Sequence, residues 1–368
     1  MRQLYLAATG QNRGKTTTSL GLFDGFRRRG FHTGFMKPVG QRTVIEDGVP
    51  ADEDAVLVKS IFDLPEPLTA MSPVHIPRGF TKAYIAGDVV EDLPGRIRHA
   101  RTTFADHDIL LIEGTGHAGV GAVVGLSNAA VAAMLGAPAV IVSGGGVGRP
   151  IDEIVLNASH FAAHGVTVAG AIVNKVQVDA QPTIATTLER GLARYGIPLL
   201  GILPYRPILS NPSLAMIVEG IAGELLHPGP DLDLVIGAIG IGAMHAAHVL
   251  ERLRPATLLI VPGDREELLL TLIDGHVRHG AESDVPLVSG LILTGGYEPT
   301  PKVIEAVRRG DLFTLLVRDD TYPVASAVHD LLVKTHAADR EKIELIKELV
   351  WEHLTMDRFL EVAAAVPA

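Results

Sequence analysis

One short segment constrains the fold of this chain more than any other, because it joins an apolar run to a helix start through a loop bounded by glycines. Residues 4–19 read LYLAATGQNRGKTTTS. Such a strand, loop and helix direct backbone N–H groups and the positive end of the helix dipole toward an anion. In this arrangement Lys15 reaches the β and γ phosphates of a nucleotide, and the Thr16 hydroxyl binds Mg²⁺. Three residues separate Gly10 from Gly14, one fewer than in the commonest form of the motif.

The segment therefore predicts a nucleotide site formed by the loop and the first turn of the helix. The alternative is an ordinary strand, turn and helix that carries a Gly-Lys-Thr triplet without any bound phosphate. The residues expected to contact the nucleotide are Gly10, Gln11, Asn12, Arg13, Gly14, Lys15, Thr16 and Thr17.

Apolar runs alternate with longer amphipathic stretches from Met1 to about Leu225, which is typical of β–α–β units on a parallel sheet. The expected strands are 4–9, 34–38, 109–113, 139–143, 168–174 and 198–203, and the expected helices are 16–29, 151–164 and 182–195. The uncharged stretch 126–147 is interrupted by Gly136 and Pro138, so we interpret it as a buried helix, a turn and a buried strand. The sequence predicts an α/β fold of the P-loop NTPase type, with helices on both faces of a parallel sheet.

A turn-forming segment, His-Pro-Gly-Pro-Asp at 227–231, interrupts the alternation and cannot continue a helix. Beyond it we expect a smaller α/β domain with strands near 234–240, 257–261, 288–294 and 313–317 and helices near 244–252, 265–278 and 300–309. The predicted organisation is a nucleotide-binding domain over 1–226, a linker over 227–232, the second domain over 233–338 and C-terminal helices over 339–368.

A magnesium ion at the loop needs acidic ligands at the same edge of the sheet. Glu113 ends the apolar run 109–112, a position where a carboxylate contacts the metal directly or through water. Asp54 lies in an acidic helix start. We predict Thr16, Asp54 and Glu113 as the metal ligands. The alternatives are a surface acid at a strand end for Glu113 and an acid favoured by the helix dipole alone for Asp54.

Two further patterns do not change this interpretation. Residues 114–119 contain a GxGxxG directly after a strand, but no acidic residue ends the next strand to hold an adenosine ribose, so a nicotinamide site is not favoured. His160 and His164 lie four residues apart on one expected helix, without an HExxH glutamate or an indicated third ligand. We interpret both histidines as ordinary helix residues rather than metal ligands.

Several short motifs are spread over the first 225 residues. They are Thr9-Gly10 with Gly14-Lys15-Thr16, Met36-Lys37-Pro38-Val39, Asp54-Ala55, Ile112-Glu113-Gly114, Asn174-Lys175-Val176 and Gly201-Ile202-Leu203-Pro204. Together they resemble the dethiobiotin synthetase family of nucleotide-dependent ligases, in a form that is also fused ahead of some phosphotransacetylases. The resemblance implies ATP and Mg²⁺ as ligands.

By this resemblance, Lys15 and Lys37 would face the transferred phosphate and the acyl oxygens and would be the catalytic residues. Asn174 would read the adenine, and Pro204 would also lie at the nucleotide. Taken alone, Lys37 could be a solvated lysine at a strand end and Asn174 a turn former. Gln11-Asn12-Arg13 and Gly40-Gln41-Arg42 depart from the dethiobiotin enzymes, which argues against dethiobiotin synthesis specifically and leaves nucleotide binding intact.

Motifs of a second family occur after the expected linker. Val235-Ile236-Gly237-Ala238 with Met244, and then Pro262-Gly263-Asp264-Arg265-Glu266, are similar to the opening and the next turn of a DRTGG domain. This small α/β module follows the ligase-like domain in phosphotransacetylases. Its naming motif is half present, as Thr294-Gly295-Gly296. We expect the acetyltransferase domain to be absent from the 368 residues.

Composition excludes several function classes. The chain has no cysteine, which removes thiolate metal sites, cysteine nucleophiles and the glutaminase that cobyrinate diamide synthases append. A net charge of -10 opposes long-range attraction to nucleic acid or to anionic membranes. Because no targeting segment is recognisable near Met1, we expect a cytoplasmic protein.

Two functions remain open on the sequence. We favour a regulatory or sensor protein that binds ATP and Mg²⁺, is related to the N-terminal region of phosphotransacetylase, and hydrolyses ATP slowly if at all. The alternative is an ATP-dependent ligase of dethiobiotin synthetase type, which forms an acyl or carbamoyl phosphate that an amine captures. We expect the chain to form a homodimer or higher homo-oligomer and to contact a protein of acetyl-phosphate or acyl-CoA metabolism. We do not expect it to bind nucleic acid or a membrane.

Overall fold

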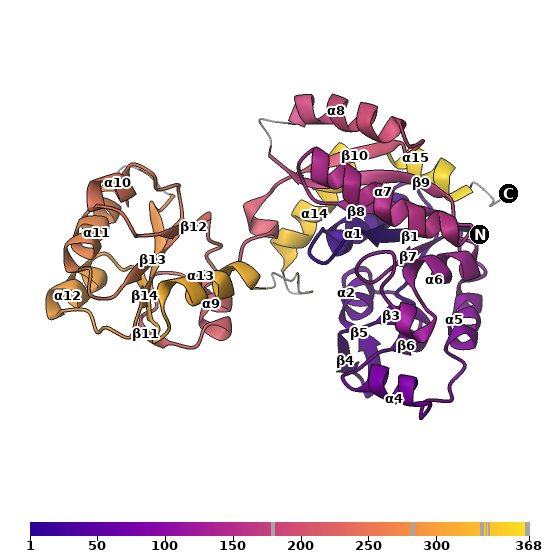
Figure 1. Cartoon of the computed structure of the whole chain (residues 1–368), viewed down its shortest axis with the longest axis horizontal. Coiled ribbons are helices and arrows are strands. Elements are labelled where there is room, and N and C mark those ends of the chain that lie inside the picture. Colours follow the sequence, from indigo (N-terminus) through magenta and orange to yellow (C-terminus); the bar gives the residue numbers. More distant parts are fainter. Residues whose placement is uncertain are drawn as a thin grey trace. The chain divides into compact units, whose positions relative to one another are not determined.

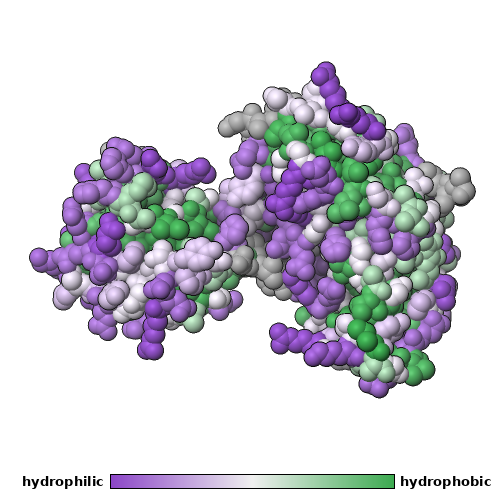
Figure 2. All heavy atoms as spheres, in the orientation of Figure 1, coloured by the Kyte–Doolittle hydropathy of each residue, from purple (hydrophilic) through white to green (hydrophobic). Residues whose placement is uncertain are grey.

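The computed structural model describes residues 1–177, 181–280, 283, 285–331, 335, 337 and 339–364. The chain divides into two compact units, one formed by Met1–Tyr205 with Thr335–Ala368 and the other by Arg206–Lys334. Each unit is an α/β body built around its own sheet (Figure 1). Hydrophilic residues cover much of the drawn face of both units, and hydrophobic residues form smaller patches within each face (Figure 2).

A six-stranded parallel sheet forms the centre of the first unit, in the order β10-β9-β8-β1-β7-β2. Its strands are β1 (Arg2–Ala8), β2 (Thr33–Met36), β7 (Ile109–Glu113), β8 (Ala139–Ser143), β9 (Val168–Val176) and β10 (Leu199–Pro204). The central strand β1 pairs in parallel with β7 through Leu4 and Leu111, and with β8 through Leu6 and Val140. All four side chains are buried, as expected for a parallel sheet covered on both faces.

Two layers of helices cover this sheet (Figure 1). One layer contains α6 (Asn128–Leu135), α7 (Gly148–Ala163) and α8 (Gln181–Ala193), and the other contains α1 (Lys15–Arg28), α14 (Arg340–His353) and α15 (Met356–Ala364). The stretch 126–147 forms α6, a left-handed turn at Gly136 and the buried strand β8, as predicted. Among the described residues, no helix combines the length and the apolar character that crossing a membrane would need. The predicted α/β fold is confirmed.

A long excursion between β2 and β7 carries the remaining elements of the first unit. They are β3 (Val39–Gly40), β4 (Thr43–Glu46), β5 (Val49–Asp52), α2 (Glu53–Phe62), α3 (Leu68–Met71), β6 (Val74–His75), α4 (Phe80–Ala86), α5 (Leu93–Arg101) and η1 (Thr102–Phe104). The Asp52 carboxylate caps α2 by accepting a hydrogen bond from the Asp54 N–H at 3.1 Å. This cap fixes where α2 begins and places Asp54 in its first turn.

The second unit contains a five-stranded sheet in the order β11-β15-β14-β13-β12. Its strands are β11 (Glu224–His227), β12 (Ala238–Ile241), β13 (Thr257–Pro262), β14 (Val288–Thr294) and β15 (Phe313–Leu316), and its helices are α9 (Leu214–Gly220), α10 (Ala246–Leu250), α11 (Glu266–Gly280), α12 (Pro301–Arg309) and α13 (Thr321–Asp330). Strand β11 is antiparallel to β15, and the other pairs are parallel. One buried cluster lies against α10, α11 and α12, and a second lies against α9 and α13.

The boundary between the units differs from the predicted one, which we correct from 226/227 to 205/206. Residues before the expected linker belong to the second unit, because Leu214 and Ile217 of α9 pack into its core and β11 pairs with β15. The turn-forming residues 227–231 therefore lie at the end of the edge strand β11 and do not link two domains. The predicted end of the second domain, residue 338, lies outside the described residues.

The C-terminal helices pack onto the first unit, where α14 contacts α1. Gly21 of α1 makes this approach possible, because a Cβ built there would lie 2.3 Å from the Cβ of Val350. We expect Gly21→Ala to lower the free energy of unfolding by about 1–3 kcal/mol through overpacking. Urea unfolding followed by the fluorescence of Trp351, the only tryptophan and a residue of α14, measures the effect.

Gly148→Ala of α7 is the matched control, because a Cβ there meets nothing within 4 Å. This change should leave stability unchanged or raise it by up to ~1 kcal/mol through helix propensity. Equal stability of the Gly21→Ala and Gly148→Ala chains would contradict the packing described here.

Candidate functional site

The loop between β1 and α1 has the backbone conformation of a compact anion-binding turn. Asn12 and Gly14 adopt positive φ angles of 57° and 87°, and α1 begins directly after Gly14. A Cβ on Gly14 would lie 1.9 Å from Nδ2 of Asn174, so only glycine fits at this position. That Nδ2 atom donates a hydrogen bond to the Arg13 carbonyl at 3.1 Å, and the Asn174 Oδ1 accepts one from the Lys175 N–H at 2.8 Å.

Oxygen atoms from three elements converge beside the start of α1. The Thr16 hydroxyl lies 3.1 Å from Oδ1 of Asp54 and 3.4 Å from Oε1 of Glu113. The Ser19 hydroxyl donates to the other carboxylate oxygen of Glu113 at 2.5 Å. These contacts arise because β1 and β7 are neighbouring parallel strands whose carboxyl ends share one edge of the sheet, and α2 begins at the same edge.

Lys37 follows β2 and lies between the two carboxylates. Its Nζ atom is 2.6 Å from Oδ2 of Asp54, 3.0 Å from Oε1 of Glu113 and 3.3 Å from the Gly114 carbonyl. Only 3% of Lys37 and none of Glu113 is exposed. The cluster is therefore a largely buried charge group in which one ammonium pairs with two carboxylates, rather than a solvated lysine at a strand end.

The pKa values follow from this burial and pairing. Burial, together with the neighbouring Lys37 charge, lowers the pKa of Lys15 to about 8. Burial alone would lower the pKa of Lys37, but Asp54 and Glu113 raise it well above its usual value. Burial would raise the pKa of Asp54, yet the Lys37 ammonium holds it at about 2. Burial raises the pKa of Glu113.

Two supports of the site were missed by the sequence analysis. Glu153 of α7 holds the loop, since its carboxylate accepts hydrogen bonds from the Thr9 hydroxyl at 2.8 Å and the Arg13 guanidinium at 3.1 Å. Asn128 of α6 holds the segment after β7, since its Oδ1 accepts from the Tyr5 hydroxyl at 2.8 Å and the Thr115 N–H at 3.0 Å. No sequence motif marks either residue.

The segment 114–119, with its GxGxxG pattern, lies beside the loop. The Lys15 ammonium reaches the carbonyl of Gly116 at 3.5 Å. Asn157 of α7 accepts a hydrogen bond from the Ala118 N–H at 2.7 Å. The glycine at 114 is required because a Cβ there would lie 2.6 Å from Oδ1 of Asn128.

The structure thus brings together most of the residues predicted for the site. Residues 10–14 form the loop and 15–17 begin α1, and Thr16 and Lys37 each contact both Asp54 and Glu113. Asn174 contacts the loop backbone through its amide. Pro204 ends β10, where it is paired with Val176, and no described hydrogen bond joins it to the loop.

The donor set suits a magnesium ion. A hydroxyl and two carboxylates are oxygen ligands of the kind that Mg²⁺ prefers in phosphate-binding sites. The Lys37 ammonium already lies between the two carboxylates, so these carboxylates favour a positive charge at this position. Thr16, Asp54 and Glu113 are therefore the residues that would hold the metal.

Comparison with known proteins assigns a family to each part of the chain. Residues 2–213 match an AAA domain, and residues 216–331 match a DRTGG domain. Phosphate acetyltransferase from Pseudomonas putida is 29% identical over 373 residues, with 96% of this chain and 51% of that protein covered. Phosphate acetyltransferase from Pseudomonas aeruginosa is 26% identical, with 97% and 51% covered. The chain therefore spans about half the length of these curated relatives.

Two solved structures have lower sequence identity to the chain than these relatives do. The septum site-determining protein MinD from Pyrococcus horikoshii OT3, complexed with Mg-ADP, is 16% identical, with 56% of this chain and 83% of that chain covered and a TM-score of 0.37. The CBS and DRTGG domains of the Clostridium perfringens pyrophosphatase, complexed with diadenosine tetraphosphate, are 19% identical, with 45% and 81% covered and a TM-score of 0.29.

The second family match begins at residue 216, which agrees with a unit boundary before α9 rather than at the predicted linker. Both parts of the resemblance inferred from the sequence are confirmed. The chain belongs to the AAA domain family in its dethiobiotin synthetase-like P-loop form, with a DRTGG domain after it, as in the N-terminal region of long phosphate acetyltransferases.

Proposed function

We propose that the chain binds ATP with Mg²⁺ at the loop 9–16 and acts as a regulatory nucleotide-binding protein of the phosphate acetyltransferase type. One observation carries the proposal. The Thr16 hydroxyl and the carboxylates of Asp54 and Glu113 converge directly beside the loop and the start of α1, where Lys15 extends from the first turn. This is the combination of anion-binding backbone and cation-binding oxygens that a nucleotide and its metal need.

Each residue has a distinct task in this account. The N–H groups of the loop and the first turn of α1 bind phosphate oxygens, and the Lys15 ammonium neutralises them. A Mg²⁺ ion held by Thr16, Asp54 and Glu113 would supply further neutralisation of phosphate charge. Lys37 keeps Asp54 ionised and holds both Asp54 and Glu113 in place before the nucleotide arrives, and its ammonium must leave the two carboxylates when a cation binds them.

The regulatory assignment rests on the domain pairing. The DRTGG domain follows the P-loop domain, and the relatives that match over nearly the whole chain are phosphate acetyltransferases. We infer that nucleotide occupancy of the first unit alters homo-oligomer assembly or the contact with a protein of acetyl-phosphate or acyl-CoA metabolism. Slow ATP hydrolysis is compatible with this role, because the metal ligands are intact.

The ligase alternative is favoured by the same intact residues, with Lys37 orienting an acyl or carbamoyl oxygen. Against it, Arg42 in the segment after Lys37 is engaged with the start of α2. Arg42 pairs with Glu53 at 3.0 Å, and its N–H donates to the Asp52 carboxylate at 3.4 Å. This part of the chain is used to hold the start of α2.

A turnover assay separates the two functions. ADP release from ATP·Mg²⁺ is measured with and without a diamino acid plus bicarbonate, and sedimentation velocity is measured with and without ATP·Mg²⁺. We expect slow or absent ADP release that the acceptors do not stimulate, together with a nucleotide-dependent change in sedimentation. Stimulation of ADP release by the acceptors would establish the ligase and refute the regulatory assignment.

A further inference from the structure

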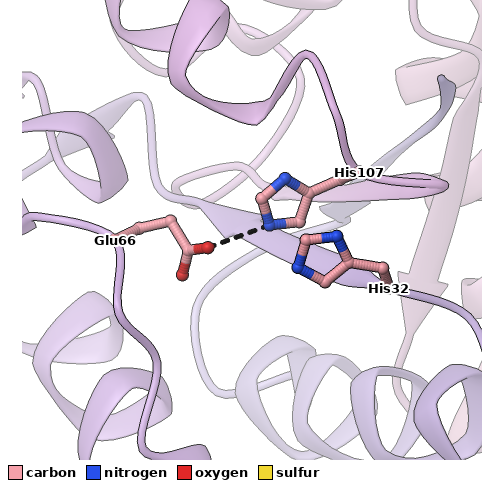
Figure 3. Close-up of side chains that lie close together, drawn as sticks. All are labelled: His32, Glu66 and His107. Atoms are coloured by element: carbon pink, nitrogen blue, oxygen red, sulfur yellow. Dashed lines mark hydrogen bonds and ion pairs between the residues drawn. The ribbon is translucent and has the colours of Figure 1, made fainter.

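A second cluster of potential ligands lies apart from the loop. His32, Glu66 and His107 point toward one another (Figure 3), and one ligand atom from each lies within 4.8 Å of the other two. Nε2 of His107 is 2.9 Å from Oε1 of Glu66. The two imidazole rings stack with their centroids 3.9 Å apart and their planes 15° from parallel. One ligand atom from each of two imidazoles and one carboxylate therefore lies within reach of a single ion, and one imidazole must rotate out of the stack for both nitrogens to bind it.

The cluster is buried on one side and incompletely bonded. Glu66 and His107 are only 8% and 7% exposed, whereas His32 is exposed. The second carboxylate oxygen of Glu66, Oε2, is buried and has no hydrogen-bond partner among the described residues. Buried carboxylate oxygens without a partner are rare, because leaving one unbonded costs the full desolvation of the group. A bound cation would satisfy this oxygen.

The position of the cluster in the fold separates it from the nucleotide site. His32 directly precedes β2 and His107 precedes β7, so both lie at the amino ends of these neighbouring parallel strands. Lys37 and Glu113 lie at the opposite, carboxyl ends of the same strands. At 3.3 Å per residue, the five steps from His32 to Lys37 span about 16 Å.

Glu66, the third ligand, is likewise separated from the nucleotide site by the length of one element. Asp54 lies in the first turn of α2 and Glu66 lies four residues beyond the end of that helix, at Phe62. Thus β2, β7 and α2 each carry a charged residue of the nucleotide site at or next to one end. Each of them carries a ligand of the second cluster at or just beyond the other end. An ion held there would tie β2, β7 and the end of α2 together, and so brace the positions of Lys37, Glu113 and Asp54.

We propose that His32, Glu66 and His107 bind a divalent transition-metal ion of the zinc class. Two histidines and a glutamate form a known zinc donor set that leaves one position for water, whereas imidazole ligands disfavour Mg²⁺. A pocket of roughly 380 Å³, lined by Arg27, Phe62 and Asp63 as well as by His32 and Glu66, adjoins the cluster and gives an ion and its water access.

The test is a Zn²⁺ titration of the nucleotide-free full chain in competition with a chromophoric chelator, with excess Mg²⁺ present to occupy the acidic site. The wild type should bind one Zn²⁺ per chain. The double variant His32→Ala/His107→Ala should bind it about 100-fold more weakly or not at all, since loss of even an outer partner of a metal ligand costs roughly 10- to 100-fold. Zn²⁺ should also raise the Tm of the wild type but not that of the variant.

The matched control is His160→Ala/His164→Ala, which removes two histidines spaced for metal binding, one in the last turn of α7 and one directly after it. Nδ1 of His164 is already bonded to the His160 carbonyl at 3.0 Å, so this pair should not contribute. Failure of the wild type to bind Zn²⁺, or equal loss of binding in the two double variants, would overturn the proposal. Neither result would bear on ATP binding.

A second measurement covers the case in which loss of buried His107 prevents folding. The exposed His32 can be replaced alone, and Co²⁺ can be used as the probe. The wild type with Co²⁺ should show visible absorption bands of a nitrogen- and oxygen-ligated ion, and His32→Ala should reduce their intensity several-fold. Unchanged bands in His32→Ala would exclude the site.

Discussion

Replacing Lys15 by alanine is expected to weaken the binding of ATP·Mg²⁺ at least about 100-fold, which corresponds to ~2.7 kcal/mol. The expected loss is large because the Lys15 ammonium is already partly withdrawn from water in the nucleotide-free protein, where burial lowers its pKa to about 8. A desolvated charge interacts strongly with a phosphate and loses little hydration when the phosphate arrives. Isothermal titration calorimetry of the wild type and the variant measures the change.

Lys82→Ala is the matched control for this prediction, because it removes the same charge from an exposed position on α4. Its affinity for ATP·Mg²⁺ should remain within about twofold of the wild type, since exposed charges are largely screened. Equal affinities of the Lys15→Ala and Lys82→Ala chains would remove Lys15 from the phosphate site.

Replacing Lys37 by methionine is expected to lower the free energy of unfolding by about 3–5 kcal/mol. The variant leaves the buried Glu113 carboxylate and the partly buried Asp54 carboxylate without their shared counter-charge. Mg²⁺ should restore part of the lost stability, because a cation between the carboxylates replaces the ammonium. Urea unfolding followed by Trp351 fluorescence, with and without Mg²⁺, measures both effects.

The stability deficit of Lys37→Met should also depend on pH. Without the ammonium, the two carboxylates have raised pKa values in the folded chain and ordinary ones in the unfolded chain. The folded state then binds more protons, so the deficit is fully present at neutral pH and shrinks as the pH falls toward ~5. Arg96→Met is the control, because the Arg96–Glu91 pair is exposed and should contribute about 0–1 kcal/mol at most. A deficit no larger than that of Arg96→Met would contradict the buried charge cluster.

The strands and the loop could be predicted from the sequence, because each depends on the types and order of a few consecutive residues. Continuous apolar runs such as 109–112 identify strands that are buried on both faces, and the glycine-bounded loop before Lys15 identifies the turn. The meeting of Thr16 with Asp54 and Glu113 also followed from a general rule, since the carboxyl ends of parallel strands share one edge of the sheet.

What the sequence did not reveal depends on contacts between distant residues. Glu153 supports the loop from α7, where polar residues are already expected on the face turned away from the sheet. Asn128 supports the segment after β7 from the apolar helix α6. His32 and His107 are 75 positions apart and become neighbours only because Thr33 of β2 pairs with Ile109 of β7. The unit boundary was misplaced because a Pro- and Gly-rich turn looks the same inside a domain and between domains.

The most direct test of the nucleotide site is a calorimetric titration of ATP into the wild-type chain, performed once with Mg²⁺ and once with EDTA. One ATP per chain should bind in the presence of Mg²⁺, and the affinity should fall at least about tenfold in EDTA, because Thr16, Asp54 and Glu113 would then lack the ion they hold. Absence of binding at millimolar ATP, or binding that is the same with Mg²⁺ and with EDTA, would contradict the assignment of this site.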